Sequence, residues 1–251
     1  MTIILFVVIL WYSGLFFQSF FLHRYAAHQT FTMSKTAEKI TYVLTWLFQG
    51  PSYLSAYGYG IMHRIHHAYT DTEKDPHSPS YDANLFAMMW KTKNIYQDIN
   101  NDRIEVDKKF KINVPQWKGF DAFASSRFSR LLWGALYIAF FAVFATSWWQ
   151  WLLLPVALFM APVHGVIINW FAHIIGYTNF KTTDTSKNLF RFDFLMMGEG
   201  YHNNHHKYAA RPNFGGVHWY EIDVTYSIMK VLHAIGFIKL KPIALKVKAT
   251  R

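Results

Sequence analysis

The chain has 251 residues, of which 52% are hydrophobic, 19% are aromatic and only 16% are charged, with a formal net charge of +10. Soluble domains carry about 25% charged residues, so the composition excludes an ordinary soluble protein and favours membrane spans joined to a polar part. The sequence contains no cysteine, which excludes disulfides and thiolate metal ligands, and it shows no nucleic-acid-binding motif, so we expect the positive charge to attract membrane lipids.

The first predicted element is a membrane span over residues 2–22. No Asp, Glu, Lys or Arg occurs between Met1 and His23. The alternative is a cleaved secretory signal, but the segment lacks the basic start and the small-residue cleavage site of such signals. We therefore expect a retained span.

Residues 40–62 form a second uncharged stretch, which Gly50 and Pro51 interrupt. Histidine motifs precede and follow this stretch, and they can meet only if both lie on the same side of the membrane. A single crossing is then excluded. We predict an interfacial or re-entrant helix, followed by a polar region over residues 63–130.

The longest uncharged stretch covers 50 residues, 131–180. As a helix it would reach about 75 Å, more than twice the hydrocarbon thickness of about 30 Å. Two spans, 131–151 and 152–176, therefore fit better than one. The turn is expected at residues 146–151, where three tryptophans favour the membrane–water interface.

The remaining residues, 177–251, are polar. Asp223 is expected to cap a last amphipathic helix that ends before Gly236, and the basic tail 239–251 is expected at the membrane surface. The apolar face of that helix comprises Val224, Ile228, Val231, Leu232 and Ile235.

Together these elements predict one all-α membrane domain over residues 1–251, with about three full spans, one interfacial or re-entrant helix and a polar cap over 63–130 and 177–251. The positive-inside tendency places the cap and the C-terminus in the cytoplasm and the N-terminus outside.

Nine of the thirteen histidines form four tight groups. Two groups share the spacing H-x-x-H-H, one reads H-x-x-x-x-H, and one pairs an asparagine with a histidine four residues later. Together they contain His23 and His28; His63, His66 and His67; Asn169 and His173; and His202, His205 and His206.

On a helix, positions i, i+3 and i+4 share a face, so each H-x-x-H-H motif directs three imidazoles into one volume. His23 and His28 lie about 140° apart on an α-helix and would need local unwinding to meet. One such motif can arise by chance, but two copies beside two further groups favour a metal centre. His77, His164, His218 and His233 are isolated and are not expected to be ligands.

Nine imidazoles and one amide exceed the four to six ligands of one transition metal, so we expect two metals with four or five ligands each. Zinc suits imidazole but has no redox chemistry, iron suits an oxygen-activating site, and the ligands alone leave copper open. Carboxylates should hold the imidazole tautomers. The nearest candidates in the sequence are Asp71, Asp75, Asp193 and Glu199.

The motifs HRYAAH, HRIHH with DPH, NWFAH and GEGYHNNHH resemble the histidine boxes of the integral-membrane fatty acid desaturases, especially the stearoyl-CoA (delta-9) type in a short bacterial form. The resemblance implies two iron ions held by the nine histidines, with Asn169 holding a water on one iron. It also implies O2 as co-substrate, a saturated fatty acyl chain that loses two hydrogens, and a bacterial inner-membrane location.

The substrate head group stays open between acyl-CoA, acyl-lipid and acyl-carrier protein. Acyl-CoA enzymes of this family usually carry Trp-x-Arg-Asp before the second box, where this sequence reads Tyr59, Gly60, Ile61 and Met62. The haem motif of a fused cytochrome b5 domain is absent from the sequence. The resemblance therefore implies an external electron donor such as ferredoxin, cytochrome b5 or a reductase.

Two other functions remain as alternatives. A related di-iron alkyl or lipid hydroxylase would use the same ligands and insert oxygen. A metal transporter would place its ligands near the bilayer midplane and often shows internal repeats, whereas here the ligands lie at span ends and no repeat is visible.

Overall fold

The protein is described by a computed structural model that covers residues 1–242, so most of the predicted surface tail 239–251 lies outside the described residues. The helices of the first half are α1 Thr2–Phe17, η1 Gln18–Ala27, α2 Lys35–Gln49, η2 Gly50–Ser52, α3 Ala56–Tyr69, α4 Leu85–Asn100, α5 Lys108–Lys111 and α6 Lys118–Ala124. Those of the second half are α7 Arg127–Phe144, η3 Trp148–Leu153, α8 Leu154–Leu158, α9 Met160–Val166, η4 Ile167–Phe171, α10 Ala172–Ile174, α11 His202–Lys207 and α12 Val224–Ala234.

Two helices of the described chain are long and apolar enough to cross a membrane. The first is the continuous helix Thr2–Ala27, which consists of α1 and the π-helix η1, and the second is α7. A third span results if the bent pair Trp148–Leu158 and Met160–Ile174 crosses as one. The predicted all-α membrane fold is confirmed, because helices dominate and the described sheet has only two short strands.

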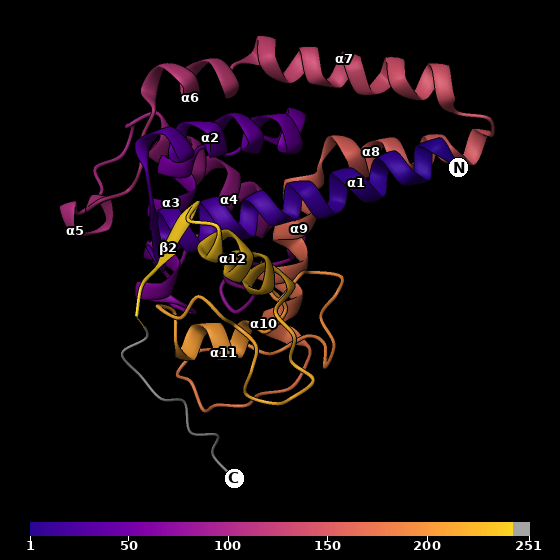
Figure 1. The fold of residues 1–251 in the computed structure, drawn as a ribbon. Helices are drawn as coiled ribbons and strands as arrows, with labels where there is room; N and C mark the ends of the chain where they lie inside the picture. Colours follow the sequence, from indigo (N-terminus) through magenta and orange to yellow (C-terminus); the bar gives the residue numbers. More distant parts are fainter. Residues whose placement is uncertain (243–251) are drawn as a thin grey trace.

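The spanning helices pack through a core cluster of α1, α7, α8 and α9 side chains, including Ile3, Val7, Tyr137 and Phe141. Their other faces are apolar but exposed, as for Leu131, which is 73% exposed. Such a surface suits lipid and not water. The N-terminus lies beside the turn after α7, at the end of the spans far from the histidine-bearing helix α11 (Figure 1).

Residues 40–62 form two helices instead of one. Ser34 and Ser55 cap α2 and α3 with side-chain hydrogen bonds to backbone N–H groups. Gly50 separates the helices with a φ of +52°, where a side chain would also collide with the Tyr137 ring. The apolar stretch is therefore divided at the Gly-Pro break into two helices, neither of which is among the candidate membrane spans of the described chain.

The predicted continuous span 152–176 is broken. The two helical parts meet at Phe159 with a bend of 75°. Pro162 lies in the first turn of α9, where its missing N–H costs no helical hydrogen bond, whereas a continuous helix would have required that donor. The bend lets the last segment leave the spanning direction and carry His173 toward α11 (Figure 1).

The C-terminal helix α12 begins and ends as predicted: the Asp223 side chain accepts the Tyr226 N–H, and Gly236 follows the helix with a φ of +79°. Its predicted apolar face is only partly correct, since Val231 and Ile235 are 60% and 71% exposed. After α12, strand β2 Ile238–Leu240 pairs antiparallel with β1 Phe31–Met33, which follows the first histidine motif. This pairing was not predicted.

Candidate metal centre

The nine clustered histidines form two adjoining groups between η1, α3, α10 and α11. In each group, one nitrogen from every ring lies within 4.8 Å of the others. The first group contains five residues and the second contains four: His23, His28, His63, His67 and His205; then His66, His173, His202 and His206.

The five-histidine group is linked by a chain of short contacts between Nε2 atoms. These atoms are 2.9 Å apart for His28 and His63, and 3.0 Å apart for His63 and His67. They are 2.9 Å apart for His67 and His205, and 3.0 Å apart for His205 and His23. A metal with nitrogen bonds of about 2.1 Å at right angles places adjacent ligand nitrogens about 3.0 Å apart. The spacing therefore fits a shared metal ion.

The four-histidine group has the same character. The Nε2 atoms of His173 and His202 are 3.0 Å apart, and those of His66 and His206 are 3.3 Å apart. The two groups are neighbours, since the ring centroids of His67 and His206 are 4.6 Å apart. Two metal ions would therefore lie side by side.

Each H-x-x-H-H motif is divided between the two groups in a reciprocal way. In α3, the i and i+4 residues join the five-histidine group and His66 joins the other. In α11, the i and i+4 residues join the four-histidine group and His205 joins the first. The prediction that all three imidazoles of one motif enter one volume is therefore wrong in part, because the residue at i+3 joins the neighbouring group.

A π-helix explains how His23 and His28 meet. The N–H of His28 donates to the carbonyl of His23 across five residues, at 3.0 Å, and the two ring centroids are 4.9 Å apart. Because a π-turn closes over five residues instead of four, positions i and i+5 come to the same face. The local unwinding that the spacing required is thus built into the end of the first span.

Buried acidic and hydroxyl groups fix the other ring nitrogen of several histidines. Glu199 lies 2.5 Å from His23 Nδ1, and Asp75 lies 2.9 Å from His66 Nδ1. His173 Nδ1 contacts the Thr185 hydroxyl at 3.1 Å. A carboxylate that accepts the Nδ1–H keeps Nε2 unprotonated and directed at the metal position.

The contacts of the four predicted carboxylates differ. Asp71 accepts from the Thr185 N–H and hydroxyl, and it lies 3.8 Å from His173 Nδ1. Asp193 was expected to hold an imidazole, and this prediction is wrong. Its carboxylate accepts the backbone N–H groups of Met196, Gly198 and Gly200, because the tight loop around it buries these donors. Asp193 therefore holds the loop that carries Glu199, and not an imidazole.

A further carboxylate, Asp184, was not predicted to contact a histidine. Its Oδ2 lies 3.2 Å from His206 Nδ1. Asp184 precedes His206 by 22 residues in an irregular segment, so no helical spacing related the two. The only available signal was its proximity in sequence to the other predicted ligands.

Electrostatics keep seven of the nine grouped histidines neutral and one acid charged. Burial, followed by the neighbouring imidazoles, lowers the pKa of six of these histidines well below its usual range and that of His66 to about 3. Although burial opposes it, the His23 ring and the Arg24 guanidinium lower the pKa of Glu199 to about 2. Neutral imidazoles are the form that binds metals, and a charged Glu199 is the form that accepts the His23 Nδ1–H.

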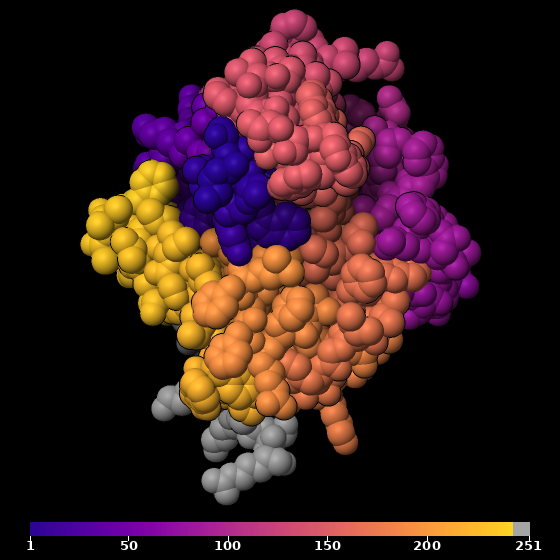
Figure 2. All heavy atoms as spheres, turned by 90° about the vertical axis from the view of Figure 1, so that its right-hand side faces the viewer, coloured from indigo at the N-terminus to yellow at the C-terminus, as the bar shows by residue number. Residues whose placement is uncertain are grey.

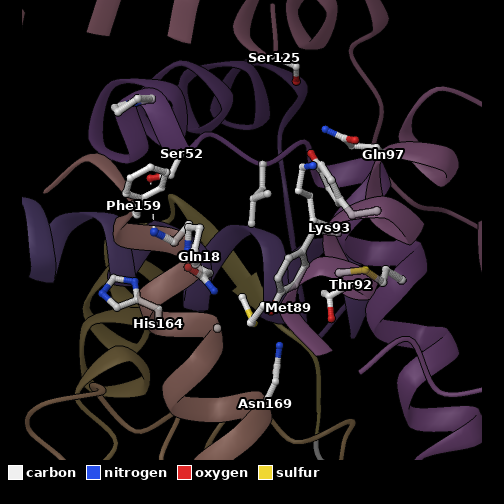
Figure 3. A pocket seen from close by; sticks show the side chains of 18 of the residues that line it. Gln18, Ser52, Met89, Thr92, Lys93, Gln97, Ser125, Phe159, His164 and Asn169 are labelled. Atoms are coloured by element: carbon white, nitrogen blue, oxygen red, sulfur yellow. Dashed lines mark hydrogen bonds between the residues drawn. The ribbon is translucent and has the colours of Figure 1, made fainter. Parts of the chain in front are cut away.

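A cavity of about 1180 Å³ reaches the centre, where His23, His63 and Glu199 line it. Asn169, on η4, points into this cavity beside Met89 (Figure 3). The cavity has a mostly apolar lining and extends to Ser125 and Arg130 at the start of α7. An apolar space of this shape suits a long hydrocarbon chain better than a polar metabolite.

Of the four isolated histidines, His77 and His164 also line this cavity. His77 stacks on His66 with centroids 4.3 Å apart, and it forms a third possible ion group with His66 and Asp75. His66 already belongs to the four-histidine group, and its Nδ1 lies 2.9 Å from Asp75. We therefore keep His77 outside the proposed ligand set.

Asp184→Asn should weaken metal binding about 10- to 100-fold, because the loss of a partner that orients a ligand has this typical effect. The amide no longer fixes the His206 tautomer as a carboxylate does. Competition with a chelator, followed by metal analysis, measures the change. Asp98→Asn, at a carboxylate that pairs only with the exposed Arg103 in the described structure, serves as the control and should change nothing. Equal chelator resistance of both variants would contradict the assignment.

Comparison with known proteins gives a consistent result. A family model described as fatty acid desaturase matches residues 1–232. The chain is 28% identical to the Delta-9 desaturase-like 5 protein of Arabidopsis thaliana, over 87% of this chain and 69% of that protein. It is 27% identical to the sn-1 stearoyl-lipid 9-desaturase of a Synechocystis strain, over 88% and 66%. It is 28% identical to Delta-9 acyl-lipid desaturase 1 of Arabidopsis thaliana, over 85% and 67%.

Proposed function

Because the chain belongs to the fatty acid desaturase family, we propose that it introduces a double bond into a saturated fatty acyl chain at a centre of two iron ions. The ligands in this proposal are the nine grouped histidines, and Asn169, which lines the adjoining cavity, would hold a water on one iron. The observation that carries this proposal is the division of nine Nε2 atoms into groups of five and four at ligand spacing. Zinc would fit the imidazoles but could not take part in electron transfer.

Iron bound here would supply the change of oxidation state that the oxygen-dependent reaction needs. In the overall reaction, two adjacent methylenes each lose one hydrogen, and O2 with two electrons and two protons becomes two waters. The protein residues hold the ligands in one tautomer, bury the centre from water and align the chain beside it. Alignment is the demanding step, because a flexible chain must present one particular pair of methylenes.

The cavity mouth supports a membrane-borne substrate. Exposed apolar side chains line the cavity, with Phe86 and Trp90 on α4 and Leu131 and Ile138 on α7. Since α7 is a span, an acyl chain can pass from the bilayer between these helices, which both lie on the face that Figure 2 shows. The absence of the Trp-x-Arg-Asp motif and the names of two relatives agree with an acyl-lipid substrate.

The remaining parts of the proposal rest on the family and on the distribution of charge. An external donor such as ferredoxin, cytochrome b5 or a reductase supplies the electrons. The basic cap faces the cytoplasm and the N-terminus lies outside, in what we propose is a bacterial inner membrane.

Gly165→Phe should abolish turnover while iron stays bound. A side chain at residue 165 points between Asn169 and Met89, and the first carbon of that side chain finds only ordinary contacts at 3.8 Å. Alanine therefore fits, whereas the phenylalanine ring occupies the cavity beside the centre. Product formation and iron content of Gly165→Phe and Gly165→Ala give the comparison. Substantial activity in Gly165→Phe would show that the substrate does not use this part of the cavity.

The function is tested by expression in cells that lack endogenous desaturation, followed by a fatty acid profile. New monounsaturated chains are expected on membrane lipids. Folded, iron-loaded protein with a competent donor and no new double bond would refute the proposal. Hydroxylated chains would instead support the hydroxylase alternative, and tightly bound metal without turnover would support transport or storage.

A further inference from the structure

Part of the predicted polar cap carries an exposed apolar surface. Six large side chains in two loops are 36% to 86% exposed, with Trp219 the most exposed of them. We call this set the aromatic wedge. It consists of Phe190, Phe192, Phe194, Leu195, Trp219 and Ile222.

The polarity of the wedge is the reverse of that in a water-facing loop. Phe192 and Phe194 are 53% and 56% exposed, whereas Asp193 between them is 1% exposed. The inward Asp193 binds three backbone N–H groups, and its own N–H donates to the Tyr201 hydroxyl at 3.1 Å. The loop is therefore held in the conformation that turns its aromatic rings outward.

The wedge is joined to the first span. Trp11 Nε1 donates to the Leu195 carbonyl at 3.0 Å. About 20 helical residues cross a hydrocarbon core. Every 20-residue window of the span Thr2–Ala27 includes Trp11, so the Leu195 backbone lies at membrane level whichever window crosses. The indole donor also satisfies a carbonyl that lipid could not.

The neighbouring surface of α1 is also apolar and exposed: Leu5, Val8 and Tyr12 are 40% to 57% exposed. In Figure 2 the orange surface of the loop lies directly below the indigo N-terminal helix, so the two surfaces are continuous. Aromatic side chains favour the boundary between acyl chains and head groups. Exposed Arg191, within the loop, is placed to meet lipid phosphate.

From this continuity we propose that the aromatic wedge inserts into one leaflet of the bilayer as a monotopic anchor that does not cross it. Insertion fixes the cap against the membrane independently of catalysis. A second protein copy is a less suitable partner, because the wedge continues a surface that lipid already covers.

The absence of cysteine from the sequence permits a direct test. Single variants Phe192→Cys and Phe194→Cys are labelled with an environment-sensitive fluorophore in the full-length protein, reconstituted in phosphatidylcholine–phosphatidylglycerol vesicles. Leu131→Cys on the span and Lys109→Cys on the exposed helix α5 give the lipid and water references.

Lipids with a nitroxide on the acyl chain, near the head group or near the chain end, should quench the wedge labels at least about twofold more than the Lys109 label, because the wedge is attached to the span at Trp11. Aqueous iodide should quench mainly the Lys109 label. Iodide quenching at residues 192 and 194 equal to that at residue 109 would overturn the proposal. Protection from both quenchers would overturn it as well, since a protein and not lipid would then cover the wedge.

Discussion

His205→Ala is expected to reduce turnover by at least about a hundredfold, because removal of a residue that merely orients a ligand can already cost that much. The His205 Nε2 atom lies between two others of the five-histidine group, 3.0 Å from His23 and 2.9 Å from His67. Removing it separates His23 from the rest of the chain of contacts. The measurement is double-bond formation per folded chain with donor and O2 supplied.

The matched control is His233→Ala, an exposed histidine on α12 outside both groups. It should retain wild-type turnover. His202→Ala and His206→Ala should lose activity as His205→Ala does, since all three lie in the groups. Full activity in any of these three variants would remove that residue from the centre.

Arg24→Met is expected to destabilise the protein by about 3–5 kcal/mol, the typical cost of removing one partner of a buried ion pair. Arg24 is fully buried and lies 2.5 Å from Glu199 and 2.8 Å from Asp223. Its guanidinium also donates to the Pro212 carbonyl at 2.9 Å and covers the Phe214 ring at 3.7 Å. Without it, two buried carboxylates face each other with no cation between them.

Thermal unfolding of the purified protein in detergent measures this loss. Arg103→Met provides the same substitution at an exposed ion pair with Asp98, 3.7 Å long, and should change stability by less than about 1 kcal/mol. If the two variants unfolded at the same temperature, the buried network would not have the structural importance that we assign to it.

The sequence was sufficient to predict the elements of the fold that depend on local patterns. Uncharged length predicted the long apolar helices, and the Gly-Pro pair predicted the interruption of residues 40–62, because each feature acts through nearby residues. The bend before Pro162 was not predicted, although proline marks possible helix starts. A proline near a helix start and one in a kinked span look alike until the packing around them is known.

The sequence predicted which histidines gather in the structure but not how they are arranged. Spacing identified nine histidines, yet their division into five and four depends on how α3 crosses α11, which no local pattern encodes. The five-residue spacing of His23 and His28 predicted local unwinding of the helix, but it did not specify that this unwinding is a π-helix. Asp184 and the aromatic wedge depend on irregular loops, where contacts are set by tertiary packing and not by a period.

The metal content of the purified protein tests the arrangement of the centre most directly. After iron loading and removal of loosely bound metal, elemental analysis should give about two iron ions per folded chain, one for each histidine group. His205→Ala should lower this number, whereas His233→Ala should leave it unchanged. One iron or fewer per chain in a fully active preparation would contradict the two-ion centre.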